Sequence, residues 1–268
     1  MSKVLTEQKN QILTVIINRP EVKNAVDRET ADLLAETFRE FDNDQRLKVA
    51  VLWGKGGTFC AGADLNPVSK ISEGEGNRLS KDMSQDGPMG PTRMKLNKPV
   101  IAAISGYAVA GGLELACWCD LRVVEEDAVL GVFCRRFGVP LIDGGTQRLP
   151  RLIGISWAMD LILTGRAVGA QEALSMGLAN RVVGSGSSRK EAEKLAAYLG
   201  EFPQGCMLSD RKAVYEGFNQ ELDEAMQIEF ELGMQVIESG ESEKGADNFM
   251  RGSGRHGEFD YPDNCSEE

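Results

Sequence analysis

The chain has little histidine, no excess of positive charge and no long apolar run, and each shortage argues against a class of function. Its 268 residues include one histidine, His256, in a glycine-rich tail, which argues against a histidine-based catalytic triad. The net charge of −11 argues against binding to nucleic acid or to an anionic membrane surface. The longest apolar run is interrupted at residues 105–107 and is too short to span a bilayer. We therefore expect neither a nucleic-acid nor a membrane partner.

Metal-type cysteine pairs and targeting signals are also missing. The six cysteines show no CxxC spacing, and several lie in apolar runs, so we expect reduced thiols that pack as small hydrophobic side chains. Residues 1–10 have neither the apolar core of a secretion signal nor the arginines of an organellar transit peptide. These features predict a cytoplasmic protein without a metal site.

Strand-like and helix-like segments alternate through the first half of the chain. β-Branched and apolar runs predict strands at 11–18, 48–53, 100–104, 120–125 and 128–131. Helices are predicted from an N-cap at Asp27 to about Phe41, and over 112–119. This alternation is typical of an α/β protein with a mostly parallel sheet covered by helices.

From residue 155 onward the pattern is almost wholly helical, with one strand-like piece at 180–183. Periodicity and capping residues predict helices at 155–163, 170–176, 189–199, 207–216 and 221–238. The pattern breaks near Phe202 and Pro203, so we expect a core over residues 1–200 and a helical unit over 201–268. Leu222 and Met226 follow helical spacing and predict a packing face that suits a subunit contact.

Residues 66–97 form a long polar stretch that is rich in glycine and proline and carries three methionines. A connection of this length inside a compact domain is usually a functional lid, a binding loop or a disordered segment. A surface insertion without a function is the other interpretation, and the sequence leaves these alternatives open.

The segment from Val100 to Cys119 carries a single charged side chain, Glu114. A carboxylate in apolar surroundings is costly to bury, and burial raises its pKa toward the range useful for proton transfer. Glu114 is therefore a candidate catalytic acid/base. The alternative is a first-turn carboxylate that the helix dipole stabilises.

Two turns of small residues, at 59–64 and 110–114, each follow a predicted strand. Small residues let the backbone approach a ligand and point free N–H groups at it. Gly111 lies where a helix begins, so its N–H has no partner within that helix. One amide from each turn could hold a carbonyl oxygen as it becomes an enolate, whereas ordinary strand–helix packing is the alternative.

Four segments together resemble the enoyl-CoA hydratase/isomerase (crotonase) family, and the resemblance covers most of the chain. They are FCAGAD at 59–64, KPVIAAISGYAVAGGLELACWCD at 98–120, GGTQRLPRLIG at 144–154 and LTGRAVGAQEALSMGLANRVV at 163–183. The resemblance implies a crotonase-like spiral of ββα units with a helical C-terminal region for trimerisation. It also implies an acyl-CoA thioester substrate, a homotrimer or dimer of trimers, and no cofactor, because coenzyme A is part of the substrate.

The resemblance also implies roles for individual residues. The amides of Ala63 and Gly111 match the oxyanion hole of the family, and Glu114 matches its first catalytic glutamate. Six further positions are expected to contact the substrate: Ala61, Asp64, Leu65, Gly112, Cys134 and Pro140. For Asp64, organisation of the adjacent turn is the alternative.

The chain departs from typical hydratases at Cys134, where they carry a second glutamate. Asp143 is the nearest replacement carboxylate and a second candidate catalytic residue; its alternative role is the N-cap of a helix that opens at Gly144. We expect hydration of trans-2-enoyl-CoA through a stabilised enolate. The alternatives are an enoyl-CoA isomerase, another acyl-CoA reaction of the family, and a non-catalytic acyl-CoA-binding relative.

Overall fold

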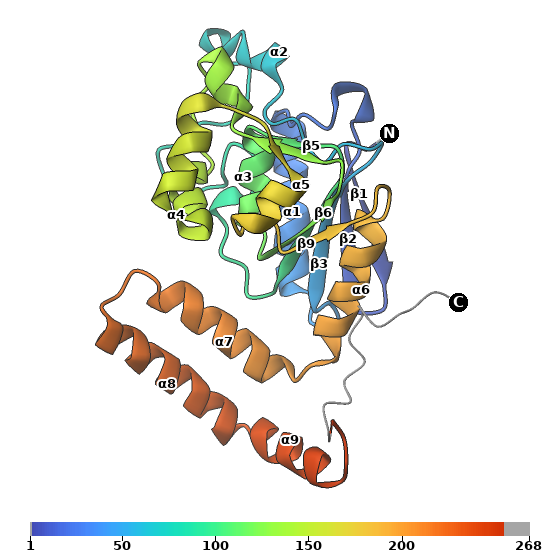
Figure 1. Cartoon of the computed structure of the whole chain (residues 1–268), viewed down its shortest axis with the longest axis vertical. Coiled ribbons are helices and arrows are strands. Elements are labelled where there is room, and N and C mark those ends of the chain that lie inside the picture. The colour runs from blue at the N-terminus through green and yellow to red at the C-terminus, as the bar shows by residue number, and fades with distance from the viewer. Residues whose placement is uncertain (1, 255–268) are drawn as a thin grey trace. The chain divides into compact units, whose positions relative to one another are not determined.

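The computed structural model describes residues 2–254, so His256 and Cys265 lie outside the described part of the chain. The chain divides into two compact units, Met1–Ala196 and Ala197–Glu268, which Figure 1 displays by residue colour. In the described part, no helix is both long and apolar enough to cross a membrane.

The N-terminal unit is built on a six-stranded sheet with the strand order β1-β2-β3-β4-β6-β9. The strands are β1 (Val4–Lys9), β2 (Ile12–Ile17), β3 (Val49–Gly54), β4 (Val100–Ile104), β6 (Leu121–Glu125) and β9 (Arg181–Val183). Only the β1–β2 pair is antiparallel, which confirms the predicted mostly parallel sheet. The sequence reading missed β1 because only Val4 of this edge strand is buried.

The buried and largely apolar character of the central strands follows from helices on both sides of the sheet. In β2, Leu13 and Val15 join the core cluster that contains Phe38 of α1 (Arg28–Asn43). The Thr14 hydroxyl between them donates to Glu193 of α6 (Ser188–Glu201), 2.8 Å away. Since successive side chains of a strand point to opposite faces, α1 and α6 cover opposite faces of the sheet (Figure 1).

A smaller sheet carries the site. It consists of β5 (Tyr107–Val109), β7 (Val129–Gly131) and β8 (Val168–Gly169), in that order. The sequence reading missed β5 and β8, which are too short to show a period. β5 runs directly into α3 (Gly111–Trp118), a helix whose residues are all buried. Short α2 (Leu65–Val68) and α5 (Ala170–Ser175) complete the connections.

Helix α4 (Gly145–Thr164) begins ten residues before the predicted start at 155. Gly154, with φ +76° and ψ 160°, breaks the helix into two arms, and the sequence reading found only the second arm. The first arm was missed because glycines open it and Pro150 lies within it, and both residue types usually interrupt helices. This arm supplies Gly145 and Arg148 to the site.

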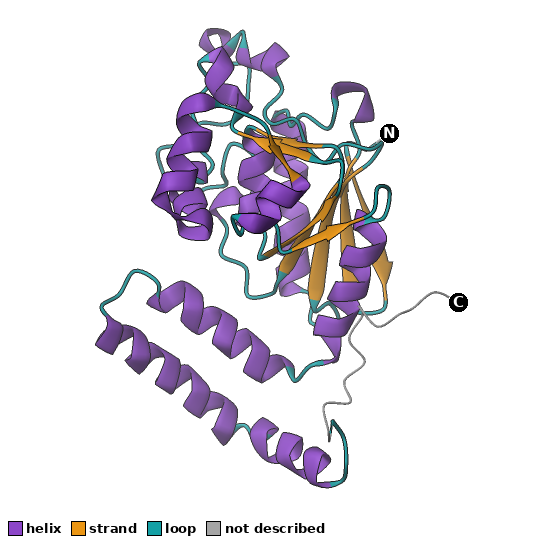
Figure 2. Ribbon diagram, in the orientation of Figure 1, coloured by secondary structure: helices purple, strands orange, loops and turns teal. Residues whose placement is uncertain are grey.

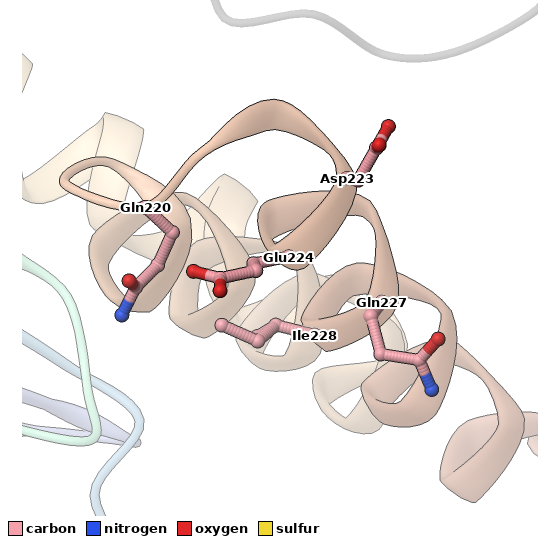
Figure 3. A pocket seen from close by; sticks show the side chains of 5 residues that line it. All are labelled: Gln220, Asp223, Glu224, Gln227 and Ile228. Atoms are coloured by element: carbon pink, nitrogen blue, oxygen red, sulfur yellow. The ribbon is translucent and has the colours of Figure 1, made fainter.

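The C-terminal unit contains α7 (Gln204–Gly217), α8 (Leu222–Glu238) and α9 (Glu241–Met250), drawn as helices in Figure 2. The Glu241 carboxylate accepts from the amides of Gly205 and Cys206 at 3.2 and 2.7 Å, so α9 caps the start of α7. The sequence reading missed α9, which has no buried residue in its own unit to give an apolar period. Figure 3 shows an open hollow at the start of α8, lined by Gln220, Asp223, Glu224, Gln227 and Ile228; it contains no candidate catalytic residue.

Candidate active site

The two turns of small residues lie against each other at the edge of the smaller sheet. Cys60 pairs with β5: its amide donates to the Tyr107 carbonyl at 2.9 Å, and its carbonyl accepts from Val109 at 3.1 Å. This pairing brings Gly62 to the start of α3, where a Cβ added at Gly62 would lie 3.0 Å from the Gly111 nitrogen. Gly62 also has φ +100°, a conformation that glycine adopts readily.

The backbone pairing leaves two amides without acceptors. Val26 donates to the Gly62 carbonyl at 2.8 Å and accepts from the Asp64 amide at 3.0 Å. In a parallel bridge of this kind the N–H of the middle residue, Ala63, points to the other side. The Gly111 amide is the first of α3 and has no partner within the helix. Neither amide meets an acceptor among residues 2–254.

Close packing explains why residues 111 and 112 are both glycine. A Cβ at Gly111 would lie 2.8 Å from the Met89 sulfur, and one at Gly112 would lie 2.1 Å from the Cys60 carbonyl oxygen. Ala110, which precedes them, has φ +54° and ψ −128° and is the N-cap residue of α3. An alanine held at positive φ is strained, and such strain is common where a backbone is fixed for function.

Glu114 is buried, with 4% of its surface exposed, and is fixed through one carboxylate oxygen. Its Oε1 accepts from the amides of Asp143 and Gly145 at 2.9 and 2.8 Å. Burial, and next the charge of Asp143, raise the pKa of Glu114 to about 7, while the two amide bonds oppose this rise. Oε2 accepts no hydrogen bond from the described residues, so this oxygen is free to exchange a proton.

Cys134 lies in the 3₁₀ turn η4 (Phe133–Phe137) and is buried. Burial, and next the charge of Glu114, raise the pKa of the Cys134 thiol. A thiol with a raised pKa stays protonated at neutral pH and cannot act there as a carboxylate base.

Asp143 does not cap α4, so that alternative is wrong: the N-cap residue is Gly144, with φ +94°. The Asp143 side chain is buried and reaches the opposite segment, where its Oδ1 accepts from the Met89 amide at 2.9 Å and from the Thr92 hydroxyl. Burial is the main cause that raises the pKa of Asp143.

Residues 87–92 form a wall of the site; the sequence marked the whole 66–97 stretch as a possible lid or binding loop but did not distinguish this part of it. All six residues are buried, so this part of the 66–97 stretch is neither disordered nor a surface insertion. Met89 is 1% exposed and packs under Gly111. The available signal was the pattern Pro88-Met89-Gly90-Pro91, apolar residues inside an otherwise polar stretch.

The other residues expected to contact the substrate differ in their burial and in their partners. Asp64 pairs with Arg19 at 3.0 Å and caps α2 by accepting from the Asn66 amide at 3.1 Å, so it organises the turn. Ala61 is half-buried and Gly112 is buried, whereas Leu65 and Pro140 are exposed. Contact of these residues with a substrate stays a prediction.

Comparisons with known proteins identify the family of the chain. A family model described as enoyl-CoA hydratase/isomerase matches residues 7–255. This chain belongs to the enoyl-CoA hydratase/isomerase family. It is 32% identical over 248 residues to enoyl-CoA hydratase EchA19 of Mycobacterium tuberculosis, covering 90% of this chain and 91% of that relative. Carnitinyl-CoA dehydratase of Proteus mirabilis is 37% identical over 190 residues, which are 70% of each protein.

Solved structures confirm the expected crotonase fold. The crystal structure of an enoyl-CoA hydratase from Mycobacterium tuberculosis superposes with a TM-score of 0.86 at 34% identity, covering 93% of this chain and 96% of that one. The relatives of this enoyl-CoA hydratase/isomerase family member bear the names of different reactions, hydration and dehydration, on different acyl groups. The names of these relatives therefore share a CoA compound but not one reaction.

Proposed function

We propose that this protein is an enoyl-CoA hydratase that adds water reversibly to the conjugated double bond of a trans-2-enoyl-CoA. The observation that carries the proposal is one arrangement: a buried Glu114 with Oε2 free, next to the unpaired amides of Ala63 and Gly111. The names of relatives at about this level of identity, several of them enoyl-CoA or crotonyl-CoA hydratases, support it.

The reaction follows from these groups. The amides of Ala63 and Gly111 donate to the thioester oxygen, which withdraws electrons from the β-carbon. The ionised Glu114 takes a proton from water through Oε2 as the water oxygen bonds to the β-carbon, and the electron pair moves to form the enolate. Glu114 then returns that proton to the α-carbon, and the product is a 3-hydroxyacyl-CoA. A pKa of about 7 lets the same carboxylate give and take the proton near neutral pH.

Cys134 favours a second candidate, an enoyl-CoA isomerase. Its thiol stays protonated near neutral pH, so it cannot serve as the second carboxylate at this position. A single carboxylate can move a double bond by removing a proton from one carbon and returning it to another. Hydration requires the same group to activate water as well, and we place it first because of the named relatives.

We further propose that the chain forms a homotrimer or a dimer of trimers through residues 201–268, and that it is cytoplasmic. Exposed apolar side chains support a subunit contact; they include Phe218, which follows α7, and Leu222, Met226 and Phe230 on α8. The free cysteines of the described chain support a reducing compartment. Sedimentation analysis of the purified chain tests the assembly; a monomer would contradict it.

The reaction is tested by incubating the purified protein with a short and a long trans-2-enoyl-CoA. Loss of the conjugated absorbance and a 3-hydroxyacyl-CoA product support the hydratase. A 3-enoyl-CoA product supports the isomerase instead. Thermal stabilisation by acyl-CoA with no turnover of either substrate identifies a binding protein and contradicts both enzyme proposals.

A further inference from the structure

Asp143 and Glu114 are neighbours, but their side chains have different partners. Glu114 binds the backbone that precedes and begins α4, whereas the Asp143 carboxylate reaches the 87–92 segment. A Cβ added at Gly87 would lie 2.9 Å from Oδ1 of Asp143, so the backbone of this segment closes around that oxygen. Both donors meet Oδ1, which ties the Asp143 carboxylate to the 87–92 segment, while Oδ2 accepts no hydrogen bond from the described residues.

The segment that Asp143 holds supports the oxyanion amide. Met89, whose N–H Asp143 accepts, lies under Gly111 with its sulfur 2.8 Å from the position of an added Cβ. Arg148 of α4 connects the same two pieces, donating to the Asp143 carbonyl at 2.8 Å and to the Thr92 carbonyl at 2.6 Å. Side chain and backbone of Asp143 thus tie 87–92 to the start of α4, which also holds Glu114.

We propose that Asp143 is a positioning residue: it holds the 87–92 segment beneath Gly111 and beside Glu114, and it exchanges no proton with the substrate. This inference replaces the expectation that Asp143 is a second catalytic acid/base. The kinetic test of this inference rests on the proposed function. The claim that Asp143 holds the 87–92 segment can be tested without any substrate.

The charges around Glu114 make its titration a second measurement of the role of Asp143. Asp143 raises the pKa of Glu114 and Arg148 lowers it. Burial is the main cause that raises the pKa of the Cys134 and Cys117 thiols, on which Glu114 also acts, so both thiols are neutral near pH 7. Arg93 and Arg148 act on Asp143 itself. Removing the negative charge of Asp143 should therefore move the titration of Glu114 to lower pH.

Asp143→Asn separates the two roles, because asparagine keeps an oxygen acceptor for Met89 and Thr92 but loses the charge and the exchangeable proton. A positioning role predicts that the maximal kcat stays within about tenfold of wild type, while the limb of the pH profile due to Glu114 moves to lower pH. A proton-transfer role predicts a loss of about 10²–10⁴ in kcat at every pH. The second result would overturn the proposal.

Hydrogen exchange, read by mass spectrometry on peptides that cover residues 87–92, tests the structural part. Asp143→Ala and Thr92→Val should accelerate exchange of this segment at least about tenfold, since both remove an interaction that closes it. Asp42→Asn is the matched control: Asp42 accepts from the Asn97 amide at 2.8 Å, at the far end of the same stretch. Unchanged exchange in both test variants would contradict the proposal. If wild type shows no turnover, the proposed function fails, but the exchange data still decide the role of Asp143.

Discussion

Two carboxylic acids, Glu114 and Asp143, are buried to the same extent at the site, with 4% of each exposed. Glu114 is bound by two amides on one oxygen and keeps the other free. Asp143 is bound by an amide and a hydroxyl from a segment more than 50 residues away in the chain. The comparison teaches that burial and a raised pKa do not by themselves identify a catalytic group. Each carboxylate keeps its second oxygen free of described partners, so the difference lies in what the first oxygen holds: the start of α4 for Glu114, and the distant 87–92 segment for Asp143.

The largest expected effect comes from removing the proton carrier. Glu114→Gln keeps the size of the side chain but cannot exchange a proton, so kcat for trans-2-enoyl-CoA should fall at least about a hundredfold. Glu125→Gln is a matched control. Glu125 is also buried, but its carboxylate accepts from the amide and the hydroxyl of Ser188. Equal activity in Glu114→Gln and wild type would reject Glu114 as the acid/base.

Activity should be nearly as sensitive to a change at Gly111, where α3 meets Met89 of the 87–92 segment. In Gly111→Ala the new methyl group meets the Met89 sulfur, so the amide must move or Met89 must yield. Loss of one oxyanion donor typically costs about 10²–10³ in kcat. Gly233→Ala on α8 is the control, since an added Cβ there meets nothing within 4 Å. A Gly111→Ala enzyme with wild-type kcat would contradict the role of this amide.

A smaller effect is expected from adding the carboxylate that the site lacks. Cys134→Glu should increase the hydration rate about tenfold or more, because a second group shares the proton transfers. It should also move the Glu114 limb to higher pH, because a neighbouring negative charge raises that pKa. Product analysis and a pH profile check both effects, with Cys134→Ser as the control. A decrease in hydration together with an unmoved limb would show that this position does not face Glu114.

The smallest effect concerns stability. The pKa of Glu114 is about 7 in the folded protein and 4.5 ordinarily, so the fold favours the protonated form. Its contribution is complete below pH 4.5 and is lost as the pH rises through 7, and it amounts to at most about 3 kcal/mol. Urea unfolding at pH 5 and pH 8 should therefore show a larger loss of stability in wild type than in Glu114→Gln. Equal losses would mean that Glu114 titrates normally.

The sequence predicted best those features that depend on a single short segment. The strands β2, β3 and β4, the burial of Glu114 and the start of α3 at the glycine pair all follow from local apolar patterns and turn residues. Small residues in both turns suggested one amide from each, but the choice of Ala63 needed the family resemblance, because the two turns lie almost 50 residues apart. The backbone contacts of Cys60 with β5 supply that link in the structure.

The 87–92 wall could not be predicted in this way. Its position depends on single long-range contacts, from Asp143 to Met89 and Thr92 and from Arg148 to Thr92, and these leave no period in the sequence. The first arm of α4 was missed for a related reason: it starts with glycines and contains Pro150, and tertiary contacts of its amide with Glu114 compensate for weak local preference.

The central claim is that two backbone amides hold the thioester oxygen next to the free oxygen of Glu114. A crystal structure of the Glu114→Gln variant with a bound trans-2-enoyl-CoA tests it most directly. We predict that the thioester oxygen lies at about 2.7–3.2 Å from the nitrogens of both Ala63 and Gly111, with the side chain at position 114 facing the α- and β-carbons. A carbonyl that points away from both amides would contradict the account.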